Sequence, residues 1–203
     1  MRFKFCGITN KEDALNAINL GVDAIGFIFY EESPRAVTVE QVQEISYYLP
    51  PFITTVGVFV NAEADDVNLK VKDCHLDIIQ LHGNEAPEYC MKINSKLIKA
   101  IHVSEMSDIE KIGSYQGLVS GILLDTKSDA GYGGTGVSFD WGIALAAKDY
   151  DLPIILSGGV NVDNLSKAVQ LVNPFAIDVS SGIEAFPGKK DYNKMKDLIN
   201  VLR

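Results

Sequence analysis

Short apolar runs rich in β-branched and aromatic residues recur along the chain, each followed by a polar turn and a stretch with helical spacing. Runs of this length between turn residues are typical of buried strands. The predicted strands are residues 2–6, 23–29, 54–60, 77–82, 96–103, 120–125, 153–159 and 174–182. The predicted helices are residues 11–20, 38–48, 63–73, 86–93, 105–113, 138–148, 161–171 and 191–202, and the pattern is weakest at 105–113. Asn10 and Thr38 are placed to cap the first two helices.

This alternation predicts an α/β fold, because parallel strands need a crossover helix between them. Eight such units close into a (β/α)8 TIM barrel with an eight-stranded parallel sheet, and we predict that residues 1–203 form a single domain of this kind. An open doubly wound sheet is the alternative. The turn after the first strand, FCGITN at residues 5–10, lacks the GxGxxG pattern, which disfavours the dinucleotide-binding version of that alternative.

Composition and charge narrow the class of protein. Hydrophobic residues make up 47% and charged residues 22% of the 203 residues, as in globular proteins. The net charge of −9 disfavours nucleic acid or an anionic membrane as partner, so a bound anion must be held locally by backbone N–H groups and one or two basic side chains. No apolar run is long enough for a membrane span, and the N-terminus lacks a signal-peptide pattern. The three cysteines give no disulfide framework, and we expect a cytoplasmic protein.

Two candidate catalytic residues stand at the C-terminal ends of predicted strands, where TIM barrels carry their active sites. Asp125 ends the run GILLD, and apolar surroundings are expected to raise the pKa of its carboxyl group, as suits a general acid. The alternative is a loop or helix-capping aspartate. Cys6 ends the first strand and is a candidate base or nucleophile, or else an inert buried thiol. No CxxC or histidine-rich spacing surrounds it, so we expect no metal there.

Two glycine-containing turns follow the seventh and eighth predicted strands, where barrels often bind phosphate. One contains Gly158 and Gly159, and the other contains Ser181 and Gly182. Glycine lets the backbone approach a phosphate closely, so these turns predict a phosphate site, although ordinary turns between strand and helix are the alternative.

Three further features lie at the same predicted end of the barrel. Arg35, in the loop after the second strand, is a candidate for binding a substrate carboxylate, or else a solvated surface arginine. His82 is a candidate ligand contact, or else a structural histidine, which is the commoner role of a lone histidine. The glycine-rich loop at residues 126–137 is a candidate lid, or else a merely flexible loop.

The motifs FKFCGIT, SPRAV, VGVFVN, QLHGNE, LLDT, GGTG, LSGGV and DVSSGIE follow one another between residues 4 and 184. In this order they resemble the motifs of the phosphoribosylanthranilate isomerases of tryptophan biosynthesis. The aromatic residue before Cys6, where an aliphatic one is commoner, is a minor departure. Each motif alone is weak, but eight in order, with cysteine and aspartate in matching places, are specific.

The resemblance implies an Amadori rearrangement of N-(5-phosphoribosyl)anthranilate to 1-(2-carboxyphenylamino)-1-deoxyribulose 5-phosphate. It implies that Cys6 is the general base, that Asp125 is the general acid and that Arg35 binds the anthranilate carboxylate. It further implies that the two glycine turns bind the phosphate, through Gly158, Gly159, Ser181 and Gly182. It also implies that His82 and Asp178 line the substrate pocket. One acid and one base suffice, so no cofactor or metal is implied. The oligomeric state, monomer or homodimer, stays open.

Four rival functions share parts of this sequence pattern. The isomerase of histidine biosynthesis acts on a substrate with two phosphates and resembles paired half-barrels that use two aspartates, whereas Cys6 stands at the first position here and VGVFVNAE at 56–63 lacks a glycine pair. A ribulose-phosphate-type epimerase would need histidine and aspartate pairs for a metal, and the full set is not found. A non-catalytic phosphosugar-binding barrel is disfavoured because both Cys6 and Asp125 are present. A redox-sensing Cys6 is also conceivable.

Overall fold

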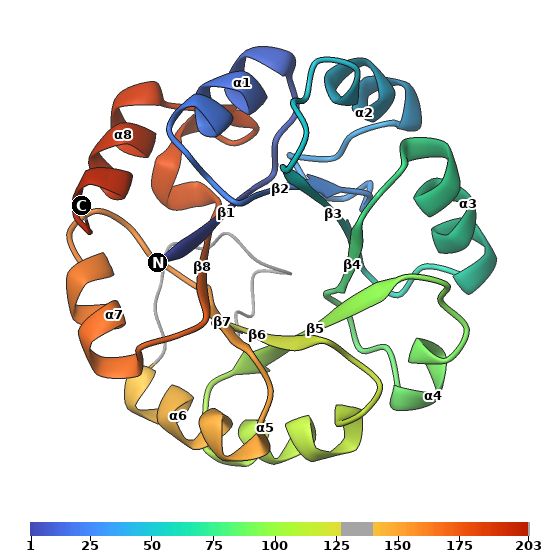
Figure 1. The fold of residues 1–203 in the computed structure, drawn as a ribbon. Coiled ribbons are helices and arrows are strands. Elements are labelled where there is room, and N and C mark those ends of the chain that lie inside the picture. Colours follow the sequence, from blue (N-terminus) through green and yellow to red (C-terminus); the bar gives the residue numbers. More distant parts are fainter. Residues whose placement is uncertain (127–139, 203) are drawn as a thin grey trace.

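The computed structural model describes residues 1–126 and 140–202. Its centre is a closed barrel in which each strand pairs in parallel with the next and β8 pairs with β1, with the helices arranged around the outside (Figure 1). The strands are β1 (Arg2–Cys6), β2 (Ala24–Ile28), β3 (Thr54–Phe59), β4 (Ile78–Leu81), β5 (Lys96–Val103), β6 (Gly121–Thr126), β7 (Ile154–Leu156) and β8 (Ala176–Val179). The (β/α)8 prediction is confirmed, and the open sheet is excluded.

The outer helices begin at side chains suited to the role. Asn10 accepts a hydrogen bond from the Asp13 amide and caps α1, while Thr38 and Gln41 form a reciprocal capping box at α2. The helices are α1 (Lys11–Asn19), α2 (Val39–Ser46), α3 (Ala64–Cys74), α4 (Pro87–Cys90), α5 (Ser107–Glu110), α6 (Trp141–Ala146), α7 (Leu165–Val172) and α8 (Tyr192–Asn200). In the described part of the chain, no helix combines the length and apolar character needed to span a membrane.

Several predicted elements are shorter in the structure. The predicted helix at 86–93 is the single turn α4, and the one at 105–113 divides into α5 and a 3-10 helix, η1 (Lys111–Tyr115). The predicted strand at 153–159 ends at Leu156, because Gly158 and Gly159 adopt positive φ angles of 79° and 67°.

The last predicted strand, at 174–182, is shorter too. It ends at Val179 and continues as a 3-10 helix, η3 (Ser181–Ile183). An unpredicted hairpin of β9 (Glu184–Phe186) and β10 (Lys189–Lys190) follows.

The inside of the barrel changes from apolar to polar along the strands. Side chains alternate between the two faces of a strand, so every second residue points inward. An apolar cluster fills part of the interior and includes Ile98, Ala100, Leu123, Ile155 and Ala176. Continuing the same alternation toward the C-terminal ends reaches His102 on β5, Asp125 on β6 and Asp178 on β8. The fold thereby concentrates polar side chains at one end of a packed interior.

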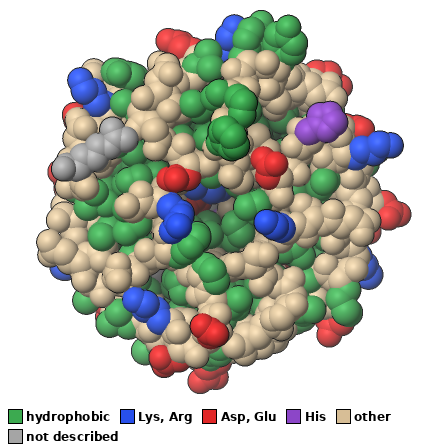
Figure 2. All heavy atoms as spheres, viewed as in Figure 1, with side chains coloured by type: hydrophobic (Ala, Val, Ile, Leu, Met, Phe, Trp, Pro, Cys, Tyr) green, Lys and Arg blue, Asp and Glu red, His purple; other side chains and the backbone are tan. Residues whose placement is uncertain are grey.

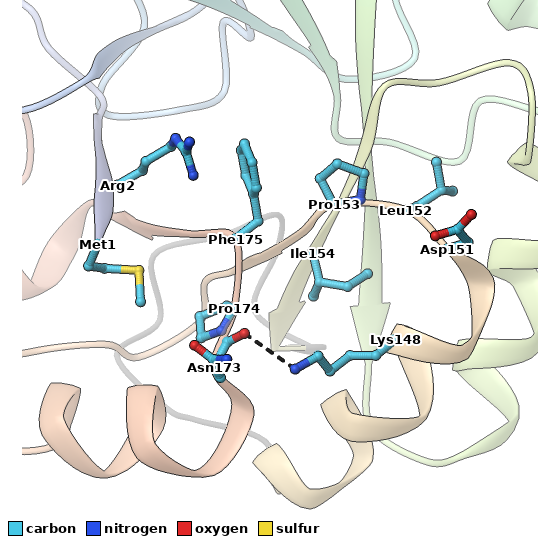
Figure 3. Close-up of a pocket in the computed structure, with 10 residues that line it drawn as sticks. All are labelled: Met1, Arg2, Lys148, Asp151, Leu152, Pro153, Ile154, Asn173, Pro174 and Phe175. Carbon is cyan, nitrogen blue, oxygen red and sulfur yellow. Dashed lines mark hydrogen bonds between the residues drawn. The ribbon is translucent and has the colours of Figure 1, made fainter.

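A cavity of about 880 Å³ opens at the opposite end, beside the starts of β1, β7 and β8 (Figure 3). Its lining includes Arg2, whose guanidinium lies 4.3 Å from the centre of the Phe175 ring, and Lys148, which donates hydrogen bonds to the carbonyls of Val172 and Asn173. The catalytic groups of TIM barrels lie at the other end. We therefore place the candidate site at the C-terminal ends of the strands.

Candidate active site

A pocket at the C-terminal ends of the strands gathers most of the sequence-predicted residues. Its lining includes Cys6 from β1, Arg35 from the loop after β2, His82 after β4, Asp125 from β6 and Asp178 from β8. A smaller adjoining cavity shares Asp125 and Asp178 and is lined by the glycine turns, including Gly158, Gly159 and Ser181. Cys6 and Asp178, which are 172 positions apart in the sequence, therefore line the same pocket.

Asp125 is buried, with 3% of its surface exposed. Its Oδ2 lies 3.1 Å from His82 Nε2, and its Oδ1 accepts a 2.9 Å hydrogen bond from the Thr126 amide. Burial acts to raise the pKa of the carboxyl group, but the hydrogen bond and charge of His82 outweigh it, so the pKa of Asp125 is lowered. The expectation of a raised pKa for Asp125 is wrong, because His82, which follows β4, supplies a hydrogen bond and a charge that favour the carboxylate.

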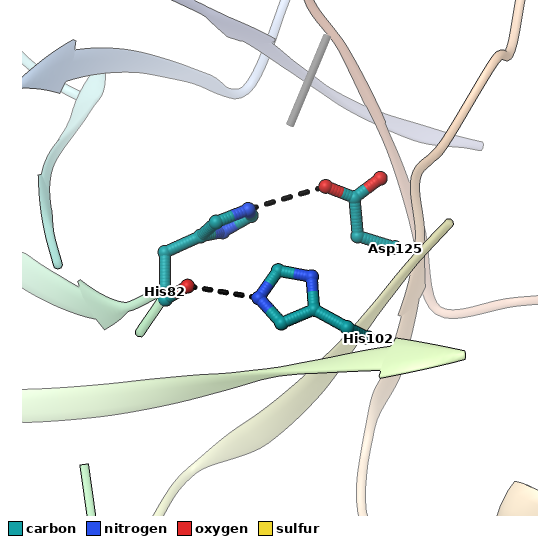
Figure 4. A group of neighbouring side chains, drawn as sticks. All are labelled: His82, His102 and Asp125. Atoms are coloured by element: carbon teal, nitrogen blue, oxygen red, sulfur yellow. Dashed lines mark hydrogen bonds and ion pairs between the residues drawn. The ribbon is translucent and has the colours of Figure 1, made fainter. Parts of the chain in front are cut away.

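His82 links Asp125 to Gln80 and His102. Its Nδ1 lies 2.8 Å from Gln80 Nε2, an amide donor, so in this arrangement the ring proton sits on Nε2 and faces Asp125. His102 Nε2 donates to the His82 carbonyl over 2.9 Å, and the two rings meet edge to face (Figure 4). Burial lowers the pKa of His102, so that ring is neutral at pH 7.

Cys6 is buried beside an ammonium group that the sequence reasoning missed. Burial raises the pKa of its thiol, and the nearby Lys4 opposes that rise by favouring the thiolate. A Cβ atom at Gly26 would lie 2.8 Å from Cys6 Sγ and 3.1 Å from Lys4 Nζ, so the missing side chain there leaves room for both groups. The signal in the sequence was a lysine two positions before Cys6, hence on the same face of an otherwise apolar strand.

Asp178 is held in place by the same lysine. Lys4 Nζ donates to Asp178 Oδ1 over 2.9 Å, and both side chains are about 5% exposed. Because a buried charge is costly without a partner, this pair fixes both groups at the pocket wall. Asp178 therefore lies in the wall of this pocket, with one carboxylate oxygen already hydrogen-bonded to Lys4.

Arg35 is a pocket residue rather than a solvated surface arginine, since it is only 8% exposed. Its Nε and Nη2 donate to the two carboxylate oxygens of Glu184 over 2.8 and 2.7 Å. Lys190 Nζ also contacts Glu184 Oε1 at 2.9 Å. The bidentate pair occupies one edge of the planar guanidinium and sets its orientation.

The two glycine turns lie against each other and against the catalytic end of β6. A Cβ atom at Gly158 would come within 2.4 Å of Thr126 Oγ1, and one at Gly182 within 2.2 Å of the Val160 carbonyl oxygen. Glycine is therefore required at both positions by close backbone approach. Gly158, Gly159 and Ser181 line the cavity, whereas Gly182 lies against the Val160 carbonyl and is not one of its lining residues.

Comparison with known proteins decides between the rival functions. The model of the family described as N-(5'phosphoribosyl)anthranilate (PRA) isomerase matches residues 3–201. The N-(5'-phosphoribosyl)anthranilate isomerase of Geobacter metallireducens is 47% identical over 199 residues, covering 98% of this chain and 97% of the relative. The crystal structure of phosphoribosyl anthranilate isomerase from Thermotoga maritima has a TM-score of 0.93 at 46% identity, covering 99% and 98% of the two chains.

A phosphoribosyl anthranilate isomerase solved in complex with reduced 1-(o-carboxyphenylamino)-1-deoxyribulose 5-phosphate has a TM-score of 0.89 at 44% identity, covering 98% of this chain and 97% of that one. This chain belongs to the N-(5'-phosphoribosyl)anthranilate isomerase family. The resemblance of the motifs is thereby confirmed, and so is the prediction of an isomerase of tryptophan biosynthesis. The rival predictions of a histidine-pathway enzyme and of a non-catalytic barrel are set aside by the same matches.

In this member of the isomerase family, the predicted lid at residues 126–137 lies outside the described residues except for Thr126, which ends β6. Thr126 donates its backbone N–H to Asp125.

We expect the isomerase to lose stability in acid partly through Glu184. Burial acts to raise the pKa of this carboxyl group, but the hydrogen bonds and charges of Arg35 and Lys190 hold it below its ordinary value. A carboxyl group with a lowered folded-state pKa stabilises the fold above its unfolded-state pKa of about 4.3, and this contribution is lost as the pH falls through the folded-state value. Urea unfolding of wild type and of Glu184→Gln at pH 7 and pH 4 measures it: the variant should lose less stability. Equal losses would contradict the contribution of Glu184.

Proposed function

We propose that this pocket isomerises N-(5'-phosphoribosyl)anthranilate by an Amadori rearrangement in which Asp125 is the general acid and Cys6 the general base. One observation carries the assignment: the carboxylate on β6 and the thiol on β1 line one pocket, with a buried arginine and a pair of glycine turns beside them. A proton donor and a proton acceptor held around one volume are what the reaction needs. The proposal requires no metal and no cofactor.

The first step opens the ribose ring. The bond between C1 and the ring oxygen breaks, the ring oxygen takes a proton from Asp125, and the nitrogen lone pair forms a C1=N Schiff base. The lowered pKa of Asp125 means that the carboxylate must first be supplied with a proton. His82 Nε2 lies 3.1 Å from Oδ2, so the two groups can share one additional proton taken up from solvent, and we assign the acid role to this protonated His82–Asp125 pair, with Asp125 facing the substrate.

The second step moves a proton away from C2. The Cys6 thiolate takes the C2 proton, the electron pair forms a C1=C2 bond, and the nitrogen regains its lone pair. The resulting enol tautomerises to the ketone. Lys4 supports this step because its ammonium favours the thiolate against the effect of burial.

We propose that the substrate is held at both ends. Backbone N–H groups of the glycine turns bind the phosphate, helped by Ser180, whose Oγ is buried without a hydrogen-bond partner among the described residues. The anthranilate carboxylate binds Arg35 at the edge of the guanidinium that faces away from Glu184, through Nη1 and the second hydrogen of Nη2. Glu184 is then a positioning residue for Arg35.

Arg35→Ala is expected to raise KM by about 10- to 100-fold, since a charged hydrogen-bonded contact contributes about 1.5–3 kcal/mol. Arg35→Lys should show a smaller increase, because the charge remains but the fork is lost. Steady-state kinetics measures both, with Arg2→Ala at the opposite end of the barrel as matched control. An unchanged KM in Arg35→Ala would refute the carboxylate contact.

We also propose that residues 1–203 form one domain in the cytoplasm. Support comes from the apolar core, which extends from residues of β1 to residues of α8, and from the three cysteines, all of them free thiols. Buried thiols of this kind fit a reducing compartment.

The activity is tested with freshly prepared N-(5'-phosphoribosyl)anthranilate, whose fluorescence decays as it is converted. Protein treated with a chelator should still convert the substrate, so that its fluorescence decays rapidly. The bisphosphorylated ribosylamine of histidine biosynthesis should stay unconverted. Loss of activity after chelation that added metal restores would overturn the cofactor-free mechanism. Conversion of the histidine-pathway substrate alone would overturn the substrate assignment.

A further inference from the structure

Three metal-ligating side chains meet at the ends of neighbouring strands. His82 follows β4, while His102 on β5 and Asp125 on β6 are direct partners in the sheet register. One ligand atom from each lies within 4.8 Å of the others, and His82 Nε2 is 3.1 Å from Asp125 Oδ2 (Figure 4). Zn–N bonds of about 2.0–2.1 Å place neighbouring tetrahedral ligands about 3.3 Å apart. The His82–Asp125 pair has this spacing, and the ligand atom of His102 lies within 4.8 Å of both partners.

Hydrogen bonds already orient two of the three ligands. His102 Nε2 donates to the His82 carbonyl, so Nδ1 is the ring nitrogen that would act as the ligand, and Figure 4 shows it on the side of the ring nearer to Asp125. Asp125 accepts the Thr126 amide with Oδ1, which leaves Oδ2 turned toward His82. Histidine and carboxylate ligands of metals are typically held by such outer hydrogen bonds to backbone groups.

Gln80 can provide the outer hydrogen bond for the third ligand, His82. A metal on His82 Nε2 would require the ring proton on Nδ1 and an acceptor for it. Gln80 Nε2 now lies 2.8 Å from Nδ1, and Gln80 Oε1 is buried without a hydrogen-bond partner among the described residues. A half-turn of the amide presents Oε1 to Nδ1 and breaks no recorded bond of that oxygen.

We propose that His82, His102 and Asp125 bind a divalent transition-metal ion of the zinc or cobalt class in the substrate-free enzyme, and that the bound ion inhibits the isomerase. Two imidazoles and one carboxylate suit zinc, cobalt, nickel or copper, whereas magnesium prefers an all-oxygen shell. Three protein ligands leave a fourth position for water. The inhibitory part rests on the proposed function, because the ion takes the carboxylate assigned as the general acid.

Cobalt(II) tests the site without reference to activity. Titration of chelator-treated wild-type enzyme should produce the visible absorption bands of low-symmetry cobalt, and zinc should abolish them by displacement. A near-ultraviolet thiolate-to-cobalt band would instead place the ion on Cys6 and overturn the ligand set. An absence of visible bands at millimolar cobalt would overturn the site itself.

His102→Gln is the diagnostic variant. The glutamine amide retains a donor for the His82 carbonyl but removes the Nδ1 ligand, so the variant should need at least about ten-fold more zinc for half-inhibition. The matched control is His75→Asn, at an exposed left-handed position (φ 50°) at the end of α3, where asparagine is well tolerated. It should be inhibited like wild type, chelator should reverse the inhibition, and magnesium should have no effect.

Failure of the ligand set, of the inhibition and of the metal site would each give a different combination of results. Equal zinc sensitivity of His102→Gln and wild type, with unchanged circular dichroism, would overturn the proposed ligand set. Cobalt bands that require His102, together with full activity of the metal-loaded enzyme, would overturn inhibition and the acid role of Asp125 while the metal site stands. Absence of both bands and inhibition in an enzyme that converts its substrate would overturn the metal proposal alone.

Discussion

Replacing Asp125 by asparagine is expected to lower kcat by about 100- to 10,000-fold, the usual contribution of a positioned general acid. Asparagine keeps the shape of the side chain and an acceptor for the Thr126 amide, but it cannot pass a proton to the ring oxygen. KM should change little, because the anchoring groups on Arg35 and the glycine turns are untouched. The measurement is steady-state kinetics with the fluorescent substrate.

The matched control is Asp77→Asn. Asp77 is also hydrogen-bonded, to Thr55, but it lies at the start of β4 and therefore at the other end of the barrel. It should turn over substrate at close to the wild-type rate. A kcat of Asp125→Asn within a few-fold of the control would remove Asp125 from the mechanism.

Cys6→Ala should likewise reduce kcat by about 100- to 10,000-fold, because no other thiol reaches the pocket to take the C2 proton. Cys74 and Cys90 are buried as well, but they end α3 and α4, outside the barrel interior. Cys74→Ala and Cys90→Ala should therefore retain nearly full turnover. Thermal unfolding of all three variants checks that each is folded.

The pH dependence of Cys6 is part of the same expectation. Because burial raises the pKa of the thiol, the thiolate gains population as the pH rises, and kcat/KM should increase with pH on the acidic side of the profile. On the alkaline side kcat/KM should fall, because the reaction needs a protonated general acid as well as a deprotonated base. A Cys6→Ala enzyme with wild-type turnover, or a profile without an acidic limb, would contradict the thiolate base.

The position of the site was predictable because it follows from two periodicities. Alternation along each strand points Cys6, Asp125 and Asp178 inward, and parallel pairing brings the ends of all strands to one rim. The loops that carry Arg35 and the glycine turns leave from that rim. These two periodicities are enough to place the residues in one pocket, without knowledge of any contact between individual side chains.

The electrostatic partners were not predictable, because they depend on side chains far apart in the sequence. His82 lies 43 positions from Asp125 and lowers its pKa, where the apolar run GILLD alone suggested the opposite. Glu184 lies 149 positions from Arg35, in the hairpin of β9 and β10, which the sequence pattern did not predict. Lys4 was the exception, since its place two residues before Cys6 put it on the same face.

A single-turnover experiment tests the acid–base assignment most directly. Enzyme in excess over freshly prepared N-(5'-phosphoribosyl)anthranilate is mixed rapidly, and the fluorescence decay is followed for wild type, Asp125→Asn and Asp77→Asn. With binding saturated, the rate reports chemistry alone. The account predicts fast decay for wild type and Asp77→Asn and at least about 100-fold slower decay for Asp125→Asn. Equal decay in all three proteins would contradict it.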